Sequence, residues 1–391
     1  MPSFLNAMTR QIPSSSIHAA TQKAEAYRRE GKKVVIFSIG RPDFDTPAHI
    51  KEAAKAALDK GYVHYTPNMG ILPLREAVAE HIKRQTGVSY DPKTEVMITC
   101  GGQQAILLTM KAVLEPGDEV LLPSPGYGLY YNCAAIADAR VRAYALKAPD
   151  FGWGGAEAGE RTKMLFINSP HNPTGAVLSK EELGQIADFA KANNLLVVSD
   201  EAYDRLLYDG LEHRSIASEP GMRDRTVILG SFSKTYSMTG WRLGYALGPA
   251  PIIQQMTKLH QFAIMSAPTT SQTAAIEALR HGDGDIDKMR RDYDMRRRFT
   301  VHAFREIGLP CFEPEGAFYL FPCIQSTGLS SEEFCERLIY SKRVAVVPGN
   351  AFGDCGEGFI RVSYCYSIEN IKEAVTRIGE FVKELEDEHD R

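Results

Sequence analysis

Short runs of consecutive apolar residues alternate with amphipathic segments over the first two thirds of the chain. Residues 96–98 and 227–229 are apolar without interruption, which is typical of strands that are covered on both faces. Residues 183–190 instead repeat apolar side chains at helical spacing, behind the capping-box pair Ser179 and Glu182. Strands that alternate with helices in this way predict an α/β fold with a mostly parallel central sheet and helices on both faces.

The same patterns predict strands and helices along the whole chain. We expect strands at residues 34–37, 96–99, 119–122, 163–167, 195–198 and 227–230, and helices at 16–30, 47–58, 74–85, 105–114 and after Ser179. Beyond about residue 250 the pattern predicts a smaller α+β domain, with helices at 285–307, 331–340 and 368–386 and strands at 317–321, 344–347 and 359–364. We therefore expect an N-terminal arm with part of the small domain (1–46), a large cofactor-binding domain (47–284) and a small C-terminal domain (285–391).

Unusual residues follow the predicted strands. In an open parallel sheet, ligands bind outside the carboxyl ends of the strands. Residues from distant parts of the chain should therefore meet at one edge of this sheet, namely Gly101, Gly102, Tyr127, Asn172, Asp200, Tyr203 and Lys234.

Composition excludes several classes of protein. With 391 residues, 44% hydrophobic and 24% charged, the chain has enough apolar residues for a large core. A net charge of -4 argues against a nucleic-acid partner. The basic runs 290–291 and 296–298 alternate with Asp292 and Asp294 in a helical pattern, which predicts a solvated helix face.

Cysteines and termini point to a cytoplasmic protein. The seven cysteines include no CxxC pair, so we expect no metal site and no disulfide framework, as in a reducing compartment. The first residues lack the pattern of a signal peptide. No apolar run approaches the roughly 20 residues that a membrane span needs.

Lys234 is the strongest candidate for chemistry. It follows an apolar run and lies in Ser231-Phe232-Ser233-Lys234, where we expect a buried strand to open into a loop. A lysine there can act as an amine nucleophile toward a carbonyl, including that of pyridoxal 5′-phosphate (PLP). The hydroxyls of Ser231 and Ser233 and the cation of Arg242 suit a phosphate beside it. The alternative is a solvated loop lysine.

Other residues supply what PLP needs, and each has a structural alternative. Asp200 can pair with the pyridine nitrogen or cap a helix. The Gly101-Gly102-Gln103 turn opens a helix and can bind an anion. Tyr127 can stack on the ring or pack in the core. The remaining candidates are Tyr203 and Asn172, for the ring hydroxyl, and Arg361, for a substrate carboxylate or a surface salt bridge.

Four motifs carry a resemblance that covers nearly the whole chain. They are Asn172-Pro173-Thr174-Gly175, Ser199-Asp200-Glu201-Ala202-Tyr203, Ser231-Phe232-Ser233-Lys234 with Gly240-Trp241-Arg242-Leu243-Gly244, and Phe359-Ile360-Arg361-Val362-Ser363. With these motifs the chain resembles the class I/II PLP-dependent aminotransferases, which have the aspartate aminotransferase fold (fold type I).

The resemblance implies a role for each matching residue. Lys234 would form the Schiff base, Asp200 would pair with the pyridine nitrogen, and Tyr203 and Asn172 would hold the ring oxygen. The phosphate would be held by Ser231, Arg242 and the turn 101–103, with Ser233 nearby and Tyr127 stacked on the ring. The substrate α-carboxylate would be received by Gly40, Asn172 and Arg361. Tyr65 matches a position that reaches the neighbour's phosphate across a homodimer.

Two residues depart from the family's pattern. Gln103 stands where some acid-specific relatives carry Lys, which weakens a purely aspartate-directed reading. Arg41 stands where many relatives are acidic, and it can either meet an acidic substrate or face water. The amino donor therefore stays open among aspartate, aromatic, branched-chain and diaminopimelate-type amino acids.

The implied reaction is ping-pong transamination from an L-amino acid to a 2-oxo acid, with 2-oxoglutarate expected as acceptor. Lys234 would move the proton from the substrate Cα as general base and acid. Two alternatives remain. One is a PLP-dependent C–S β-lyase on the same fold, and the other is a PLP-sensing regulator without catalysis, which normally carries a DNA-binding module.

Overall fold

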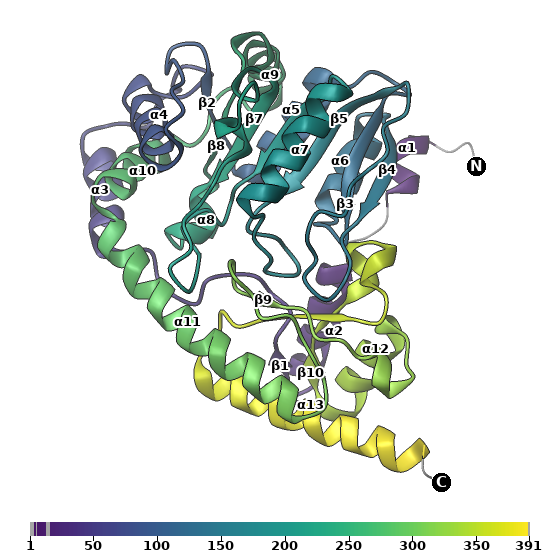
Figure 1. Cartoon of the computed structure of the whole chain (residues 1–391). Helices are drawn as coiled ribbons and strands as arrows, with labels where there is room; N and C mark the ends of the chain where they lie inside the picture. The colour runs from purple at the N-terminus through teal and green to yellow at the C-terminus, as the bar shows by residue number, and fades with distance from the viewer. Residues whose placement is uncertain (1–3, 5, 13–15, 390–391) are drawn as a thin grey trace.

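A seven-stranded sheet forms the centre of the larger part of the protein (Figure 1). The computed structural model describes residue 4, residues 6–12 and residues 16–389. In the order β2-β8-β7-β6-β5-β3-β4, the strands are β2 (Val96–Thr99), β8 (Gly244–Leu247), β7 (Thr226–Ser231), β6 (Leu196–Asp200), β5 (Thr162–Asn168), β3 (Glu119–Ser124) and β4 (Arg140–Ala145). Within this sheet β8 runs antiparallel to β2 and β7, and the other six strands share one direction. The predicted fold class is confirmed, although β4 and β8 were not among the expected strands.

Helices cover both faces of this sheet because its strands carry apolar side chains on both sides. In β3, Leu122 packs toward the face covered by α5 (Gly102–Val113), whereas its neighbour Leu121 packs toward α7 (Lys180–Ala192). The first face is completed by α6 (Leu129–Ile136) and α9 (Ala250–Ala263). The second is completed by α3 (Ala48–Asp59), α4 (Leu72–Thr86) and α10 (Thr269–His281).

The smaller part joins the two ends of the described chain. In one sheet, β1 (Val35–Ile36) pairs in parallel with β10 (Val344–Ala345). In the other, β12 (Ile360–Ser363) lies between β11 (Val347–Pro348) and β9 (Tyr319–Leu320). The expected strand 344–347 is thus split between two sheets. The helices around them are α2 (Ser16–Arg29), α11 (Asp283–Glu306), α12 (Ser331–Lys342) and α13 (Ile368–His389).

The domain boundaries at residues 46 and 284 remain a prediction. Parts of the expected N-terminal arm and the last two residues of the C-terminal domain lie outside the described residues. A short helix, α1 (Ala7–Gln11), is described within the arm. No helix in the described ranges is long and apolar enough to cross a membrane.

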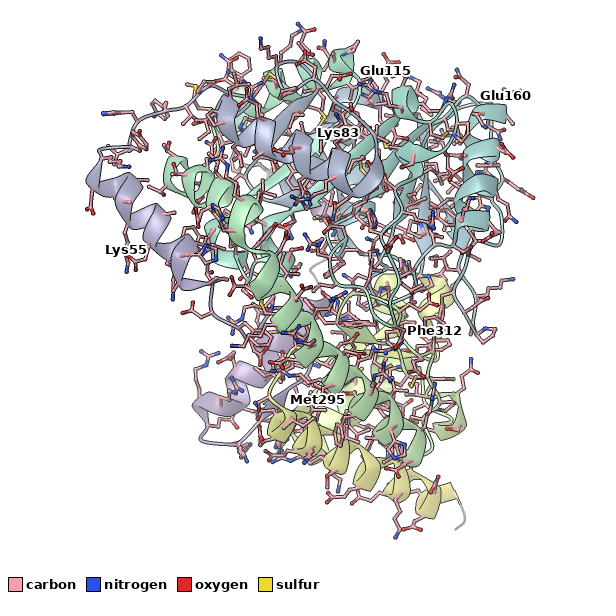
Figure 2. All side chains as sticks on the ribbon, turned by 60° about the vertical axis from the view of Figure 1, so that its left-hand side comes forward. Lys55, Lys83, Glu115, Glu160, Met295 and Phe312 are labelled. Atoms are coloured by element: carbon pink, nitrogen blue, oxygen red, sulfur yellow. The ribbon has the colours of Figure 1, made fainter. Side chains whose placement is uncertain are left out.

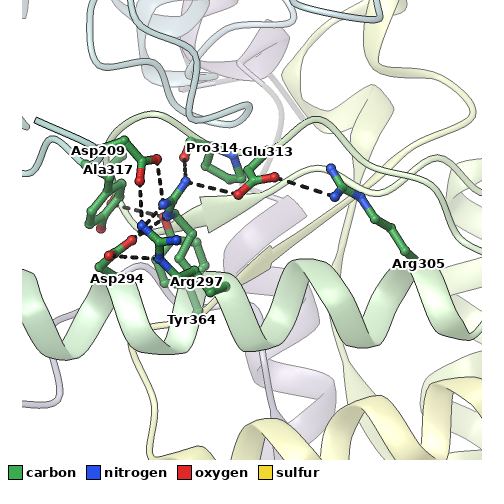
Figure 3. A network of polar contacts seen from close by, with 10 residues as sticks. Asp209, Asp294, Arg297, Arg305, Glu313, Pro314, Ala317 and Tyr364 are labelled. Atoms are coloured by element: carbon green, nitrogen blue, oxygen red, sulfur yellow. Dashed lines mark hydrogen bonds and ion pairs between the residues drawn. The ribbon is translucent and has the colours of Figure 1, made fainter. Parts of the chain in front are cut away.

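Helix α11 runs from the large part along the small part (Figures 1 and 2). Its basic run is a solvated face only in part, since Arg291 and Arg298 are exposed but two other arginines are not. Arg297 is 1% exposed and Arg296 is also buried. The Arg297 guanidinium reaches Asp209, Asp294 and the carbonyl oxygen of Pro314 at 2.7–2.8 Å (Figure 3). For Arg297 the prediction was wrong because Asp209 and Pro314, which come from distant segments, were not recognisable as partners.

Candidate active site

A cavity of about 550 Å³ opens where β5, β6 and β7 end. Most of the candidate residues line it, namely Gly40, Gly102, Gln103, Tyr127, Asn172, Asp200, Tyr203, Ser231, Ser233, Lys234, Arg242 and Arg361. Two candidates do not. Gly101 is buried next to Arg242 and is not among the lining residues. Tyr65 is 83% exposed and borders a separate hollow beside Thr269. Arg41 is exposed and does not line the cavity.

Lys234 lies on a short helix and not on the expected loop. Strand β7 continues directly into α8 (Phe232–Thr235), which Ser231 caps by accepting a hydrogen bond from the Ser233 N–H at 3.2 Å. The Lys234 amine donates to the Gly40 carbonyl oxygen. Loss of hydration, with the nearby cations Arg361 and Arg242, lowers the pKa of Lys234 to about 8. The amine is therefore partly neutral near pH 8.

Asp200 is the last residue of β6 and faces the cavity. The Tyr130 hydroxyl donates to one carboxylate oxygen at 2.7 Å, and the Ala202 N–H donates to the other at 3.1 Å. No helix begins here, so the helix-cap alternative is wrong. Burial raises the pKa of Asp200 to about 6, and no cation within the described ranges forms a salt bridge with it. Asp200 is a buried acid that lacks a positive partner.

Arg361 is fully buried on β12, so the surface salt-bridge alternative is wrong. Its Nη1 donates to the Asn172 side-chain oxygen at 3.1 Å and its Nη2 donates to the Ser38 carbonyl oxygen at 2.6 Å. Its Nε has no partner among the described residues. The guanidinium lies over the Tyr319 ring, 4.6 Å from the centroid. The two bonds use two of the five N–H groups of the guanidinium, so donors are left for a ligand.

The N-terminus of α5 forms another wall of the cavity. Gly101 has a φ of 82°, and a Cβ atom there would lie 2.7 Å from Arg242 Nη2, so glycine allows Arg242 to approach the helix. Arg242 itself has a φ of 54°, an unusual conformation for a residue with a side chain. The Gln103 amide donates to the Tyr127 hydroxyl at 3.0 Å.

Two tyrosines of the cavity were missed by sequence reasoning. Tyr130 holds Asp200, and the Tyr319 hydroxyl lies 2.7 Å from that of Tyr203. Both tyrosines stand in apolar segments, where an aromatic residue is usually part of the core. No signal in one sequence separates them from the packing aromatics around them.

Comparison with known proteins identifies the family. The profile of "Aminotransferase class I and II" matches residues 32–378. This chain is a class I/II aminotransferase. The aminotransferase is 44% identical over 360 residues to an aspartate aminotransferase from Pyrococcus abyssi, covering 90% of this chain and 92% of the relative. It is 45% identical over 358 residues to "Aromatic-amino-acid aminotransferase 2" from Thermococcus litoralis, with the same coverage of each chain.

Solved structures agree with this assignment. The aspartate aminotransferase from Thermus thermophilus with maleate superposes with a TM-score of 0.92 at 36% identity, over 97% of this chain and 99% of that one. The aminotransferase therefore has the aspartate aminotransferase fold, fold type I. Its family depends on PLP, so PLP is its cofactor. Within the described ranges, no group of three His, Cys, Asp or Glu side chains is suited to hold a metal ion.

Proposed function

We propose that this aminotransferase transfers the amino group of an L-amino acid to a 2-oxo acid, with 2-oxoglutarate as acceptor, in a ping-pong reaction that depends on Lys234. The observation that carries the proposal is the Lys234 amine, which lies at the cavity wall with a carbonyl as its hydrogen-bond partner and a pKa lowered to about 8. Such an amine is a nucleophile and a base near neutral pH.

The described residues fit PLP at both ends of the cavity. Asp200 lacks a cationic partner, and a protonated pyridine nitrogen would provide one. At the other end, the first residues of α5, together with Ser231, Ser233 and Arg242, suit a phosphate. Tyr127 would lie against the ring, while Tyr203 and Asn172 would hold the ring oxygen. When bound, PLP supplies an aldehyde for an amine and an electron sink for the charge left on the substrate Cα.

The chain's own residues would bind the substrate and move its proton. Arg361 would pair with the α-carboxylate through donors that Asn172 and Ser38 already orient, with Gly40 leaving room beside it. Lys234 would take the proton from Cα and return it, because its neutral form is accessible near pH 8. A fixed Arg361 would hold Cα within reach of Lys234, so positioning would account for much of its contribution.

The site is proposed to work in a homodimer. Exposed apolar side chains from two segments, 58–65 and 262–265, form a patch that includes Tyr65. Its members are Leu58, Tyr62, Val63, Tyr65, Phe262, Ile264 and Met265. The segments are joined by the Thr269 hydroxyl, which donates to the His64 carbonyl oxygen at 2.7 Å. Exposed apolar patches of this kind mark interaction surfaces, and a second copy of the chain would bring Tyr65 to its neighbour's cavity.

The test of the dimer is the sedimentation coefficient. Phe262→Asp should shift the protein toward monomer and reduce activity in parallel. The control is Met295→Asp, since Met295 is 56% exposed on α11 and does not belong to the patch (Figure 2). A monomeric wild-type protein with full activity would overturn this part of the proposal.

The test of the catalytic role is the Lys234→Ala variant. It should lose the visible absorbance of the PLP-loaded protein and amino transfer to 2-oxoglutarate, and borohydride should fix the cofactor to the Lys234 peptide of the wild type only. Lys55→Ala, on the exposed surface of α3, should behave as wild type (Figure 2). Unchanged turnover in Lys234→Ala would contradict the proposal. Pyruvate release from cystathionine-like substrates without 2-oxoglutarate would favour the β-lyase alternative, and a screen of amino donors would define the substrate.

A further inference from the structure

Tyr319 contacts three residues of the proposed site, each from a different segment. It lies on β9, is 2% exposed and lines the cavity. Its hydroxyl lies 2.7 Å from that of Tyr203, and its ring lies under the Arg361 guanidinium. A methyl group at Gly40 would overlap the Tyr319 hydroxyl. The residue is thus packed against groups assigned to the cofactor and to the substrate.

The position of Tyr319 is fixed by the segment that precedes it, residues 314–317. The N–H groups of Glu315 and Gly316 both donate to the Gly175 carbonyl oxygen at 2.9 Å. Ala317 has a φ of 59°, and its carbonyl oxygen accepts from the hydroxyls of Tyr208 and Tyr364. Arg297 holds the Pro314 carbonyl oxygen at 2.8 Å (Figure 3). These bonds connect Tyr319 to α11 and to the Asn172 loop.

The pair of hydroxyls has a consequence for Tyr203. Burial raises the pKa of both tyrosines, so both keep their protons. Each hydroxyl has a single proton to donate, and the hydrogen bond between the two hydroxyls uses one of these protons. If Tyr319 donates, the proton of Tyr203 is free to point into the cavity. A hydroxyl that accepts one hydrogen bond also becomes a better donor in the next.

We propose that Tyr319 is a positioning residue of the aminotransferase reaction. Its hydroxyl donates to Tyr203, so that Tyr203 donates to the ring oxygen of PLP, and its ring supports the Arg361 guanidinium from below. The inference rests on the proposed roles of Tyr203 and Arg361. It adds a residue that joins the cofactor-binding tyrosine to the substrate-binding arginine through one side chain.

The first test is spectroscopic. PLP bound through an amine changes its visible absorption when that link gains a proton, and a hydrogen bond to the negative ring oxygen lowers the pH midpoint of this change. Tyr203→Phe should raise the midpoint. Tyr319→Phe should raise it by about half to one pH unit, because one hydrogen bond acts indirectly. In a Tyr203→Phe background, Tyr319→Phe should cause no further shift.

Kinetics separate the hydroxyl from the ring. Tyr319→Phe keeps the ring under Arg361, so kcat should fall about 2–10-fold with an unchanged KM for the amino donor. Tyr319→Leu removes the ring, so this KM should also rise. The matched control is Tyr144→Phe, which removes another buried hydroxyl, one that donates to the Phe166 carbonyl oxygen at 2.8 Å outside the cavity. It should leave the midpoint and kcat unchanged.

These measurements distinguish the role of Tyr319 from the role of Tyr203. A midpoint shift in Tyr203→Phe without one in Tyr319→Phe overturns the role of Tyr319 alone. Equal shifts in Tyr319→Phe with and without the Tyr203 hydroxyl show that Tyr319 does not act through Tyr203, and they also overturn it. If Tyr203→Phe itself causes no shift, the proposed role of Tyr203 falls, and the inference falls with it.

Discussion

The Lys234 amine donates a hydrogen bond to the Gly40 carbonyl oxygen at 2.5 Å, across a sequence separation of 194 residues. Gly40 follows β1, which belongs to the smaller part of the protein, whereas Lys234 follows β7 of the central sheet. The bond therefore ties the two parts together at the proposed nucleophile. It also makes the backbone at Gly40 part of the site, independently of any side chain.

Gly40→Ala should impair the site because of crowding. The added methyl group would overlap the Tyr319 hydroxyl, so either Tyr319 or the Gly40 carbonyl must move. We expect weaker PLP binding and at least a tenfold loss of kcat/KM, measured by fluorescence titration and by steady-state kinetics. Gly184→Ala is the control, since that glycine lies inside α7 with open space around it. It should keep full activity and gain about 0.5–1 kcal/mol of stability. Wild-type behaviour of Gly40→Ala would show that the site tolerates the displacement.

Asp200→Asn should make stability less dependent on pH. The folded-state pKa of Asp200 is raised from 3.8 to about 6 by burial. The folded protein therefore binds this proton more tightly than the unfolded chain. The resulting stabilisation is fully present below pH 3.8 and is lost as the pH rises through 6. Relative to wild type, the apoprotein of Asp200→Asn should gain about 2 kcal/mol between pH 4 and pH 7.

Urea unfolding of both apoproteins at the two pH values measures this change. Comparing the unfolding free energy of Asp200→Asn with that of wild type at the same pH removes the contributions of the other carboxylates. A difference in unfolding free energy that stays constant from pH 4 to pH 7 would mean that Asp200 keeps an ordinary pKa. The variant should also lose activity, because neutral Asn cannot hold a protonated pyridine nitrogen.

Arg361→Lys should reduce kcat/KM for the amino donor by about 10–100-fold. Lysine keeps the charge but lacks the planar guanidinium. In the wild type this group donates to Asn172 and Ser38, and its Nε is unpaired among the described residues. Charge-assisted hydrogen bonds of this kind contribute about 1.5–3 kcal/mol each. Arg305→Lys, on the surface of α11, is the control. Equal kcat/KM in Arg361→Lys and wild type would remove the carboxylate role from Arg361.

Arg297→Met should destabilise the protein without changing the cavity chemistry directly. The variant leaves the Pro314 carbonyl oxygen and the carboxylates of Asp209 and Asp294 without their buried cation. Because both carboxylates are partly exposed, water can replace some of the interaction, so we expect a loss of about 2 kcal/mol in unfolding free energy. Arg298→Met, whose guanidinium is exposed, should change it by less than about 0.5 kcal/mol. Equal losses in the two variants would mean that burial of Arg297 adds nothing.

The central sheet was predictable because its strands carry their own signal. Uninterrupted apolar runs such as 227–229 can be recognised without knowing their neighbours, and the rule for parallel sheets then brings their carboxyl ends together. Strand β8 was missed because it follows β7 through α8 and a short turn, without the long helix that marks a parallel connection. The short strands β10 and β11 looked like one because a single residue, Val346, separates them.

A polar residue of the cavity could be predicted only where its residue type is uncommon in the surrounding segment. Lys234, Asp200 and Arg361 are charged residues at the ends of, or inside, apolar strands, and burying a charge needs a reason. Tyr130 and Tyr319 lack this contrast, since a tyrosine in an apolar segment packs well whether or not its hydroxyl has a task. For Arg297 the error was the opposite one, since a buried arginine was predicted to be solvated. Its partners lie 88 residues before it and 17 residues after it.

The residues that line the cavity extend from Ile39 to Arg361 in the sequence. During synthesis on the ribosome, the proposed nucleophile is therefore made more than a hundred residues before the arginine that would select its substrate. The same C-terminal stretch supplies β12 and α13, whose side chains form much of the core of the smaller part. Premature termination before Arg361 should therefore remove the arginine and the folded small part together.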